Sequence, residues 1–100
     1  MNLTLDKMAF LAKSLADENR LRILLWLGNG KKSVSRLAAE LNLSQPLVSH
    51  HLRELKRSLL VKVERRGPFI YYEMNDNGIL DILRALDELA TKLLAARTTF

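Results

Sequence analysis

The chain has 100 residues, of which 48% are hydrophobic and 27% charged, and this predicts one small globular domain over residues 1–100. It contains no cysteine, which excludes disulfides, thiolate metal sites and thiol redox chemistry. Its longest apolar stretch, Ile23 to Leu27, is far too short to span a bilayer, and charged residues interrupt any signal peptide at the N-terminus. We therefore expect a cytoplasmic protein with no membrane partner.

Positive charge is concentrated in the middle of the chain. The sequence carries 16 Lys and Arg against 11 Asp and Glu, which gives a net charge of +5. Residues 44–67 hold six of the basic residues and two acidic ones, whereas residues 68–100 hold three and five. This distribution predicts that a polyanion docks on the central segment.

Four helices are predicted before the middle of the chain ends. Their expected bounds are Asp6 to Leu15, a helix capped by Asp17 and ended by Gly28-Asn29-Gly30, Ser33 to Leu41, and Ser44 to about Ser58. Pro46 fits the first turn of the fourth helix, where its missing N–H would have no partner. Met8 and Trp26 are expected in the hydrophobic core.

Two strands and a last helix are expected next. Val61 to Glu64 alternates with period two, Arg65-Arg66-Gly67-Pro68 is typical of a turn, and Phe69 to Met74 is rich in aromatic and branched residues. This pattern predicts a hairpin with a basic tip. Asp76 is the expected cap of a helix that continues to about Arg97. The predicted fold is mainly α with a small β-hairpin, in the order α-α-α-α-β-β-α of a winged helix-turn-helix.

The predicted helix-turn-helix pair, Val34–Leu41 and Gln45–Ser58, carries the functional prediction. A core stripe of Val48, Leu52 and Leu55 is expected on the second helix. The opposite stripe is polar or short, so this helix can lie in a DNA major groove. Gln and Arg on that stripe can make bidentate hydrogen bonds to base edges.

Phosphate contacts are expected at both ends of the basic segment. The hydroxyl and backbone N–H of Ser44 can hold a phosphate at the start of the helix, and the hairpin arginines can reach phosphates or the minor groove. The residues predicted to contact double-stranded DNA are Ser44, Gln45, Pro46, Ser49, His50, His51, Arg53, Arg57, Arg65 and Arg66.

These residues also resemble a known family. Leu43 to Leu55 resembles the recognition helix of the ArsR/SmtB winged-helix repressors, and Ala16 to Leu24 is similar to the start of that family's second helix. Leu60-Val61, Arg65-Arg66-Gly67 and Tyr71-Tyr72 resemble its wing, and the resemblance covers about residues 8–75. It implies a homodimeric repressor that binds an inverted-repeat operator and is often released by a metal or another inducer.

The sequence departs from this family at two positions. Many members carry a Cys-Val-Cys metal motif where this chain has Ser33-Val34-Ser35, and a serine hydroxyl is a poor ligand for soft metals. The family's alternative site uses His on the last helix, which here contains Asp81, Asp87 and Glu88 but no His. We therefore expect no metal and no other cofactor. Leu59 stands where the family usually has Gly, which costs on the order of 1 kcal/mol if that turn is left-handed.

The terminal helices predict a homodimer. Apolar residues on the last helix repeat with heptad-like spacings and form a seam wider than one core needs. We expect this helix both to cover its own core and to pair with a second copy, together with the first helix. The alternative is a purely intrachain helical layer. The predicted interface residues are Met8, Phe10, Leu11, Ile79, Ile82, Leu83, Leu86, Leu89 and Leu93.

Other functions were weighed against a sequence-specific repressor. The chain could be a protein-interaction module, antitoxin-like or partner-docking, with weak or non-specific DNA binding. A general DNA-coating protein would bind phosphates without base preference. Catalysis has little support, because Ser49, His50 and Glu54 fall on one surface helix without an oxyanion turn, and no catalytic residue is assigned. The sequence identifies neither the operator nor an inducer.

Overall fold

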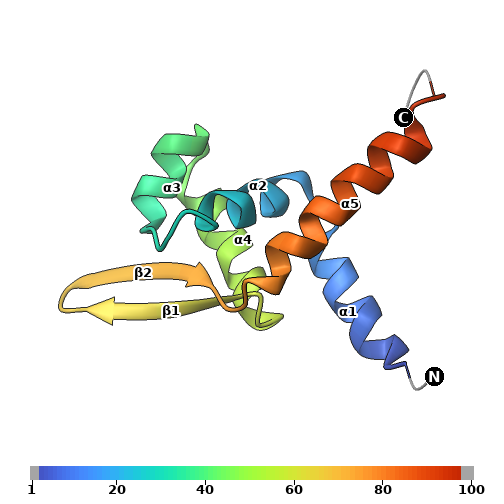
Figure 1. The fold of residues 1–100 in the computed structure, drawn as a ribbon. Helices are drawn as coiled ribbons and strands as arrows, with labels where there is room; N and C mark the ends of the chain where they lie inside the picture. The colour runs from blue at the N-terminus through green and yellow to red at the C-terminus, as the bar shows by residue number, and fades with distance from the viewer. Residues whose placement is uncertain (1–2, 98–100) are drawn as a thin grey trace.

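A computed structural model describes residues 3–97, in which five helices and one antiparallel hairpin follow one another (Figure 1). The elements are α1 (Leu5–Leu15), α2 (Glu18–Leu27), α3 (Val34–Leu41), α4 (Gln45–Arg57), β1 (Val61–Arg66), β2 (Phe69–Met74) and α5 (Gly78–Leu94). The predicted winged helix-turn-helix order is confirmed. None of the described helices is long and apolar enough to cross a bilayer.

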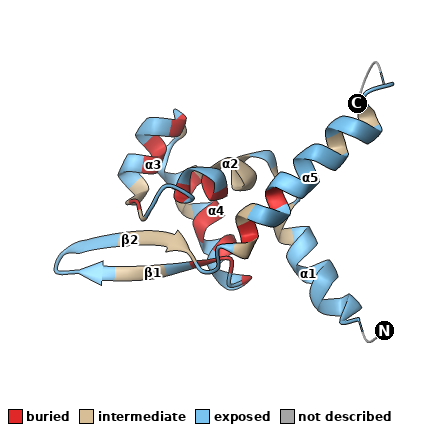
Figure 2. Ribbon diagram, in the orientation of Figure 1, coloured by how far each residue is buried: buried red, intermediate tan, exposed pale blue. Residues whose placement is uncertain are grey.

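The hydrophobic core lies where α2, α3 and α4 meet the base of the hairpin and the start of α5 (Figure 2). Apolar residues at helical spacing turn one face of each middle helix inward. The buried apolar side chains are Ile23, Leu24, Leu27, Leu37, Ala38, Leu41, Val48, Leu52, Leu55, Leu60, Val61, Ile79 and Leu83. Burial of one Val, Leu or Ile contributes about 1.5–3 kcal/mol, so this cluster fixes the angles between the middle helices.

Side-chain caps determine where the three middle helices begin. The Asp17 carboxylate accepts hydrogen bonds of 2.9 and 3.1 Å from the N–H groups two and three residues later. The hydroxyls of Ser33 and Ser44 each accept from the N–H three residues later. These N–H groups have no partner inside their helices, so each cap satisfies a donor. The predicted caps at Asp17 and Ser44 are confirmed.

The wing is a hairpin with a two-residue turn. β1 and β2 pair in antiparallel register, with Arg66 opposite Phe69. Gly67 has a φ of 59°, and Pro68 follows it with the negative φ that its ring imposes, a combination that suits a type II′ turn. The prediction that Arg65 and Arg66 lie in the turn is therefore wrong, because both belong to the end of β1.

The segment before α3 ties the helices to the wing. The backbone of Lys32 pairs with that of Tyr72 in β2 through N–H···O bonds of 2.9 and 2.8 Å. Lys32 is itself buried, and its ammonium lies 3.4 Å from a carboxylate oxygen of Glu40 on α3. The wing is thus held to the helix-turn-helix by backbone pairing as well as by the core.

α4 ends in a left-handed turn built on Leu59. Leu59 has a φ of 63°, and the N–H groups of Leu59 and Leu60 donate to the carbonyls of Lys56 and Leu55 at 3.0 Å each. This pair of bonds is the Schellman pattern, in which glycine usually occupies the left-handed position. The turn into the wing therefore forms with leucine bearing the strain that glycine would avoid.

α5 is shorter at both ends than predicted. It begins at Gly78 and ends at Leu94, and not at Arg97. Asp76 does not immediately precede the helix: its carboxylate accepts a 2.7 Å hydrogen bond from the N–H of Gly78. The predicted role of Asp76 at this end is therefore retained in kind, one residue further from the helix.

α1 and the outer part of α5 extend from the same side of the core (Figures 1 and 2). α1 has no buried residue. The expectation that Met8 and Trp26 lie in the core is wrong, because they are 51% and 38% exposed. Their exposure belongs to a wider apolar surface on α1, α2 and α5, which the chain alone leaves uncovered.

Candidate nucleic-acid interface

The turn between α3 and α4 fixes the geometry of the helix pair. Asn42 has a φ of 55°, a left-handed conformation that Asn tolerates better than most residues. The N–H of Leu43 donates to the carbonyl of Ala38 at 3.0 Å, and the side chain of Leu43 packs against the core. Ser44 then caps α4. Local bonds therefore set both the end of α3 and the start of α4.

One face of α4 is open to solvent along the whole helix. Successive residues are about 100° apart, so side chains three, four and seven positions apart share a face. The core side of α4 is buried, and on the outer side Ser49 is half-buried while its neighbours are exposed. The predicted residues that the structure brings together on this outer face are Gln45, Pro46, Ser49, His50, Arg53 and Arg57.

Ser44 lies at the positive end of this face. It is exposed, and its hydroxyl accepts from the N–H of Leu47 at 3.3 Å. The N-terminus of a helix carries a partial positive charge that favours an anion. The α4 face, defined as Ser44 and the six outer residues above, thus begins at a site of favourable potential for a phosphate.

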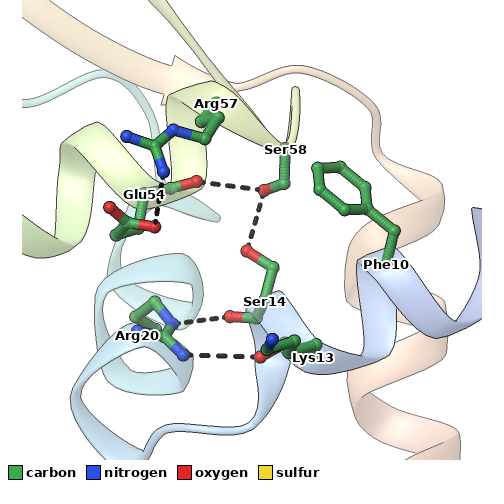
Figure 3. A pocket seen from close by; sticks show the side chains of 7 residues that line it. All are labelled: Phe10, Lys13, Ser14, Arg20, Glu54, Arg57 and Ser58. Atoms are coloured by element: carbon green, nitrogen blue, oxygen red, sulfur yellow. Dashed lines mark hydrogen bonds and ion pairs between the residues drawn. The ribbon is translucent and has the colours of Figure 1, made fainter.

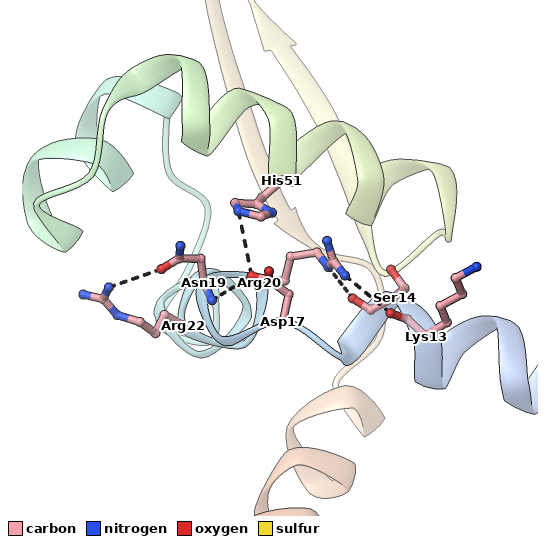
Figure 4. Close-up of polar contacts among 7 residues, drawn as sticks. All are labelled: Lys13, Ser14, Asp17, Asn19, Arg20, Arg22 and His51. Carbon is pink, nitrogen blue, oxygen red and sulfur yellow. Dashed lines mark hydrogen bonds and ion pairs between the residues drawn. The ribbon is translucent and has the colours of Figure 1, made fainter. Parts of the chain in front are cut away.

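His51 lies on a different face and is not available to DNA. It is only 5% exposed and packs against the start of α2, with its Nε2 3.8 Å from the Asp17 carboxylate (Figure 4). Its Nδ1 is buried without a hydrogen-bond partner among the described residues. Burial lowers the pKa of His51, an effect that the Asp17 carboxylate opposes and the charge of Arg20 reinforces. The predicted DNA contact by His51 is wrong, because one residue of helix rotation separates it from His50.

Asp17 and Arg20 connect this buried corner to α1. Partial burial opposes ionisation of Asp17, but hydrogen bonds from the N–H groups of Arg20 and Asn19 and the nearby His51 hold its pKa below the usual value. The Arg20 guanidinium donates to the carbonyls of Ser14 and Lys13 at the end of α1, at 2.6 and 3.4 Å (Figure 4). The recognition helix is thus coupled through α2 to the terminal helix.

The cations of the α4 face differ in their partners. Arg53 is exposed and makes no ion pair with any residue in 3–97. Arg57 faces the Glu54 carboxylate at 3.7 Å and remains 73% exposed. Lys56, which the sequence analysis missed, is also exposed and unpaired within the described chain. It lies seven residues after Ser49, so helical periodicity alone would have placed it at the edge of this face.

The wing adds two further arginines, one of which is already partnered. Arg66 Nε lies 3.0 Å from the Glu64 carboxylate, which also binds the ammonium of Lys31. Hydrogen bonds from Lys31 and Arg66 lower the pKa of Glu64. Arg65 is exposed and pairs with no described carboxylate. Arg65 therefore carries the uncompensated charge of the wing, and Arg66 must exchange an exposed ion pair to bind a phosphate.

The segment that builds this surface matches a known family. Residues 17–63, from the cap of α2 to the first strand of the wing, match the model of bacterial regulatory proteins of the arsR family. An HTH-type transcriptional regulator of Methanocaldococcus jannaschii is 36% identical over 85 residues, which cover 84% of this chain and 96% of that protein. This chain belongs to the ArsR family.

Two further comparisons agree with the family and fold of this ArsR-family chain. Transcriptional repressor SdpR of Bacillus subtilis is 36% identical over 69 residues, which cover 69% of this chain and 77% of the repressor. The homodimeric winged helix-turn-helix DNA-binding domain Mb0332 of Mycobacterium bovis has a TM-score of 0.81 and 27% identity, covering 96% of this chain and 89% of its own. The predicted fold and the role of transcriptional regulator are confirmed, and the family is one of regulators and not of enzymes.

The ArsR-family chain has two serines at the position of the family's cysteine metal motif. Ser33 Oγ and Ser35 Oγ are 3.2 Å apart, and Ser33 Oγ accepts from the N–H of Arg36. Across residues 3–97, no three His, Cys, Asp or Glu side chains lie close enough to hold a metal ion. Neutral hydroxyls engaged in capping a helix do not fit a soft metal ion.

The predicted interface residues of the ArsR-family chain divide into three groups. Ile79 and Leu83 are buried in the chain's own core, so their assignment to an interface with a second copy is wrong. Phe10 is exposed but lies about 160° around α1 from Met8, next to a hollow described below. The remaining six form exposed apolar stripes on α1 and α5, namely Met8, Leu11, Ile82, Leu86, Leu89 and Leu93.

Proposed function

We propose that this chain is a homodimeric transcriptional repressor, a single domain over residues 1–100, that binds an inverted-repeat site in double-stranded DNA. The observation that carries the proposal is the α4 face, which is exposed, polar and short-chained and holds the unpaired Arg53. A helix with such a face can enter a major groove, where an arginine can bind guanine through two hydrogen bonds. We place the protein in the cytoplasm, where a bacterial or archaeal regulator meets DNA.

The side chains divide into base readers and phosphate binders. Gln45, Ser49, His50 and Arg53 face base edges, with Pro46 packing at the rim of the groove. Ser44 holds a phosphate at the positive end of α4. Three arginines per protomer bind phosphates along the backbone, namely Arg57, Arg65 and Arg66.

The exposed apolar stripes of α1 and α5 support the dimer. Ile82, Leu86, Leu89 and Leu93 recur with spacings of four, three and four, as in the seam of a coiled coil. An apolar groove of about 530 Å³ between α2 and α5 continues this surface, with Leu25 in its wall. Soluble monomers rarely expose apolar patches of this extent. A two-fold axis through these helices would place two copies of α4 about 34 Å apart, one turn of B-DNA.

The repressor assignment follows relatives that carry that name, including SdpR and a homologue of SmtB in Synechocystis. A bound dimer represses when its operator overlaps a promoter, which the chain itself does not determine. The proposal names no metal, because Ser33 and Ser35 lack thiolates.

Selection of binding sites from a random DNA pool, followed by affinity measurements across salt concentrations, tests the proposal. We expect a two-fold-symmetric consensus. With three arginines per protomer on phosphates, the slope of log K against log salt should be about −5. Binding without any enriched sequence would indicate a general DNA-coating protein. Failure to bind DNA would favour a protein-interaction module, and either result would refute the proposal.

A further inference from the structure

A hollow of about 260 Å³ lies where the C-terminal ends of α1 and α4 meet (Figure 3). The residues that line it come from α1, the start of α2 and the end of α4, and they are Phe10, Lys13, Ser14, Arg20, Glu54, Arg57 and Ser58. The hollow is therefore bounded by both the terminal helix and the recognition helix.

The lining of the hollow is cationic. It contains three basic side chains, Lys13, Arg20 and Arg57, and one carboxylate, Glu54. The ammonium of Lys13 has no ion pair among residues 3–97, and Arg57 is held only by the 3.7 Å contact to Glu54. Arg20 is fixed by its bonds to two carbonyls of α1, so its charge stays at the wall. An anion entering here meets charges that no other group fully neutralises.

Two hydroxyls fix the relative position of the walls. Ser14 Oγ and Ser58 Oγ are 2.8 Å apart, which joins α1 directly to the end of α4. The hydroxyl of the buried Ser58 is also within hydrogen-bond distance of the Leu55 carbonyl, at 3.1 Å. In Figure 3 this pair lies between the ring of Phe10 on one side and Arg20 and Arg57 on the other. The polar lining is thus preorganised in the absence of any bound molecule.

Phe10 supplies an apolar wall that the dimer stripe does not use. It lies three residues before Lys13 and four before Ser14, so it shares their face of α1. Met8 and Leu11 face away from it, with the stripe proposed for dimerisation. Phe10 is 53% exposed, and its ring is available to pack against a ligand.

We propose that this hollow binds a small organic anion, a carboxylate or phosphate monoester, with its charged group on Lys13 and Arg57 and its apolar part on Phe10. The volume is at the low end of the range for small-molecule sites, which limits the ligand to a compact molecule. Charge-assisted bonds to Arg and Lys are the strong contacts for such a group, and the ring provides discrimination against inorganic anions.

Occupancy of the hollow would weaken DNA binding, a consequence that rests on the proposed function. Arg57 is assigned to a DNA phosphate, and it cannot bind the ligand and that phosphate with the same donors. By linkage, the factor by which ligand weakens DNA binding equals the factor by which DNA weakens ligand binding. We expect a loss of about fivefold or more, with the salt slope reduced in magnitude by about one for each arginine diverted.

The first experiment measures ligand binding without DNA. Phenyl phosphate and benzoate are titrated into the full chain and followed by amide NMR shifts, with inorganic phosphate and benzyl alcohol as comparison probes. We expect at least one organic anion to bind more tightly than both comparison probes, with the largest shifts at Ser14, Arg20 and Ser58. Lys13→Gln should weaken that binding at least fivefold, whereas Lys7→Gln, on the same helix outside the hollow, should leave it unchanged. No binding by either organic anion, or equal binding to the Lys13→Gln variant, would overturn the proposal.

The second experiment measures DNA affinity with and without the organic anion that binds, at constant ionic strength. Lys13 is not among the proposed DNA contacts, so Lys13→Gln should bind DNA normally and lose only the response to the ligand. A ligand that binds the hollow and leaves DNA affinity unchanged would refute the coupling. If the chain binds no DNA at all, the proposed function fails while the NMR titration still decides the ligand site.

Discussion

The buried His51 offers a direct test of the packing between α4 and α2, through the substitution His51→Leu. Nδ1 of His51 is buried without a hydrogen-bond partner in the described chain, and its Nε2 is 3.8 Å from Asp17, too far for a hydrogen bond. An unsatisfied buried polar atom costs about 1–3 kcal/mol, and leucine has a similar volume with no polar atom. We expect His51→Leu to raise the free energy of unfolding at pH 7.5 by about 1 kcal/mol.

The same substitution should remove a pH dependence. Because burial lowers the pKa of His51 in the folded state, the unfolded chain binds more protons once the pH falls below the ordinary value of 6.5. The contribution of His51 is therefore complete above that pH and is lost below it, by about 1 kcal/mol at one unit lower. The pKa of Asp17 is lowered from 3.8, so its own contribution changes only in more acidic solution. Wild type should lose stability between pH 7.5 and 5.5 more steeply than His51→Leu.

Urea unfolding followed by the fluorescence of Trp26, at one fixed protein concentration, measures both effects. His51→Gln is the matched control, because it keeps a polar group in the corner but does not titrate. It should flatten the pH dependence without the gain at pH 7.5. A variant His51→Leu that is less stable than wild type at pH 7.5, or that keeps the wild-type pH slope, would refute the reasoning.

Four further substitutions test the interface, the wing, the turn and the dimer. Arg53→Ala should cost about 1–3 kcal/mol on the selected consensus and less on other sequences, measured by competition binding; equal loss on every sequence would contradict base reading. Arg65→Ala should weaken binding evenly and reduce the salt slope by about one per site contacted, and an altered consensus would argue against phosphate binding. Leu59→Gly should stabilise the fold by about 0.5–1 kcal/mol in urea unfolding, because the residue is 71% exposed and left-handed; a loss of stability would show that its strain is negligible. Leu89→Lys should shift the chain toward monomer in sedimentation while Thr91→Lys does not, and a dimer that withstands Leu89→Lys would exclude this stripe.

The elements that are specified locally were predictable from the sequence. Asp17 and Ser44 begin their helices through bonds to the next turn, and those bonds depend on few residues beyond the cap. The same holds for α3, which begins at its capping serine and ends at Asn42. The family resemblance added the assignment of the wing, which short alternating strands alone would support weakly.

Features decided by tertiary contacts were not predictable in the same way. The placement of Arg65 and Arg66 in β1 depends on the pairing register, which reduces the turn to two residues. The burial of His51 depends on where α2 packs against α4, and the division of α5 into buried and exposed stripes depends on how far the core reaches along it. Lys56 is a different case, because its place on the α4 face follows from periodicity.

The absence of any buried residue on α1 has a consequence for the abundance of the protein. α1 has 11 residues, and only its C-terminal end is tied down, through Ser14 and the Arg20 guanidinium. An isolated helix of this length is marginal in water, below the roughly 12–15 residues at which even favourable sequences form helix. In the dimer that we propose, the second copy covers the stripe, so ordering of α1 and association become one equilibrium that dilution reverses. The fold thereby makes the regulator sensitive to its own copy number, since only chains numerous enough to pair complete their first helix.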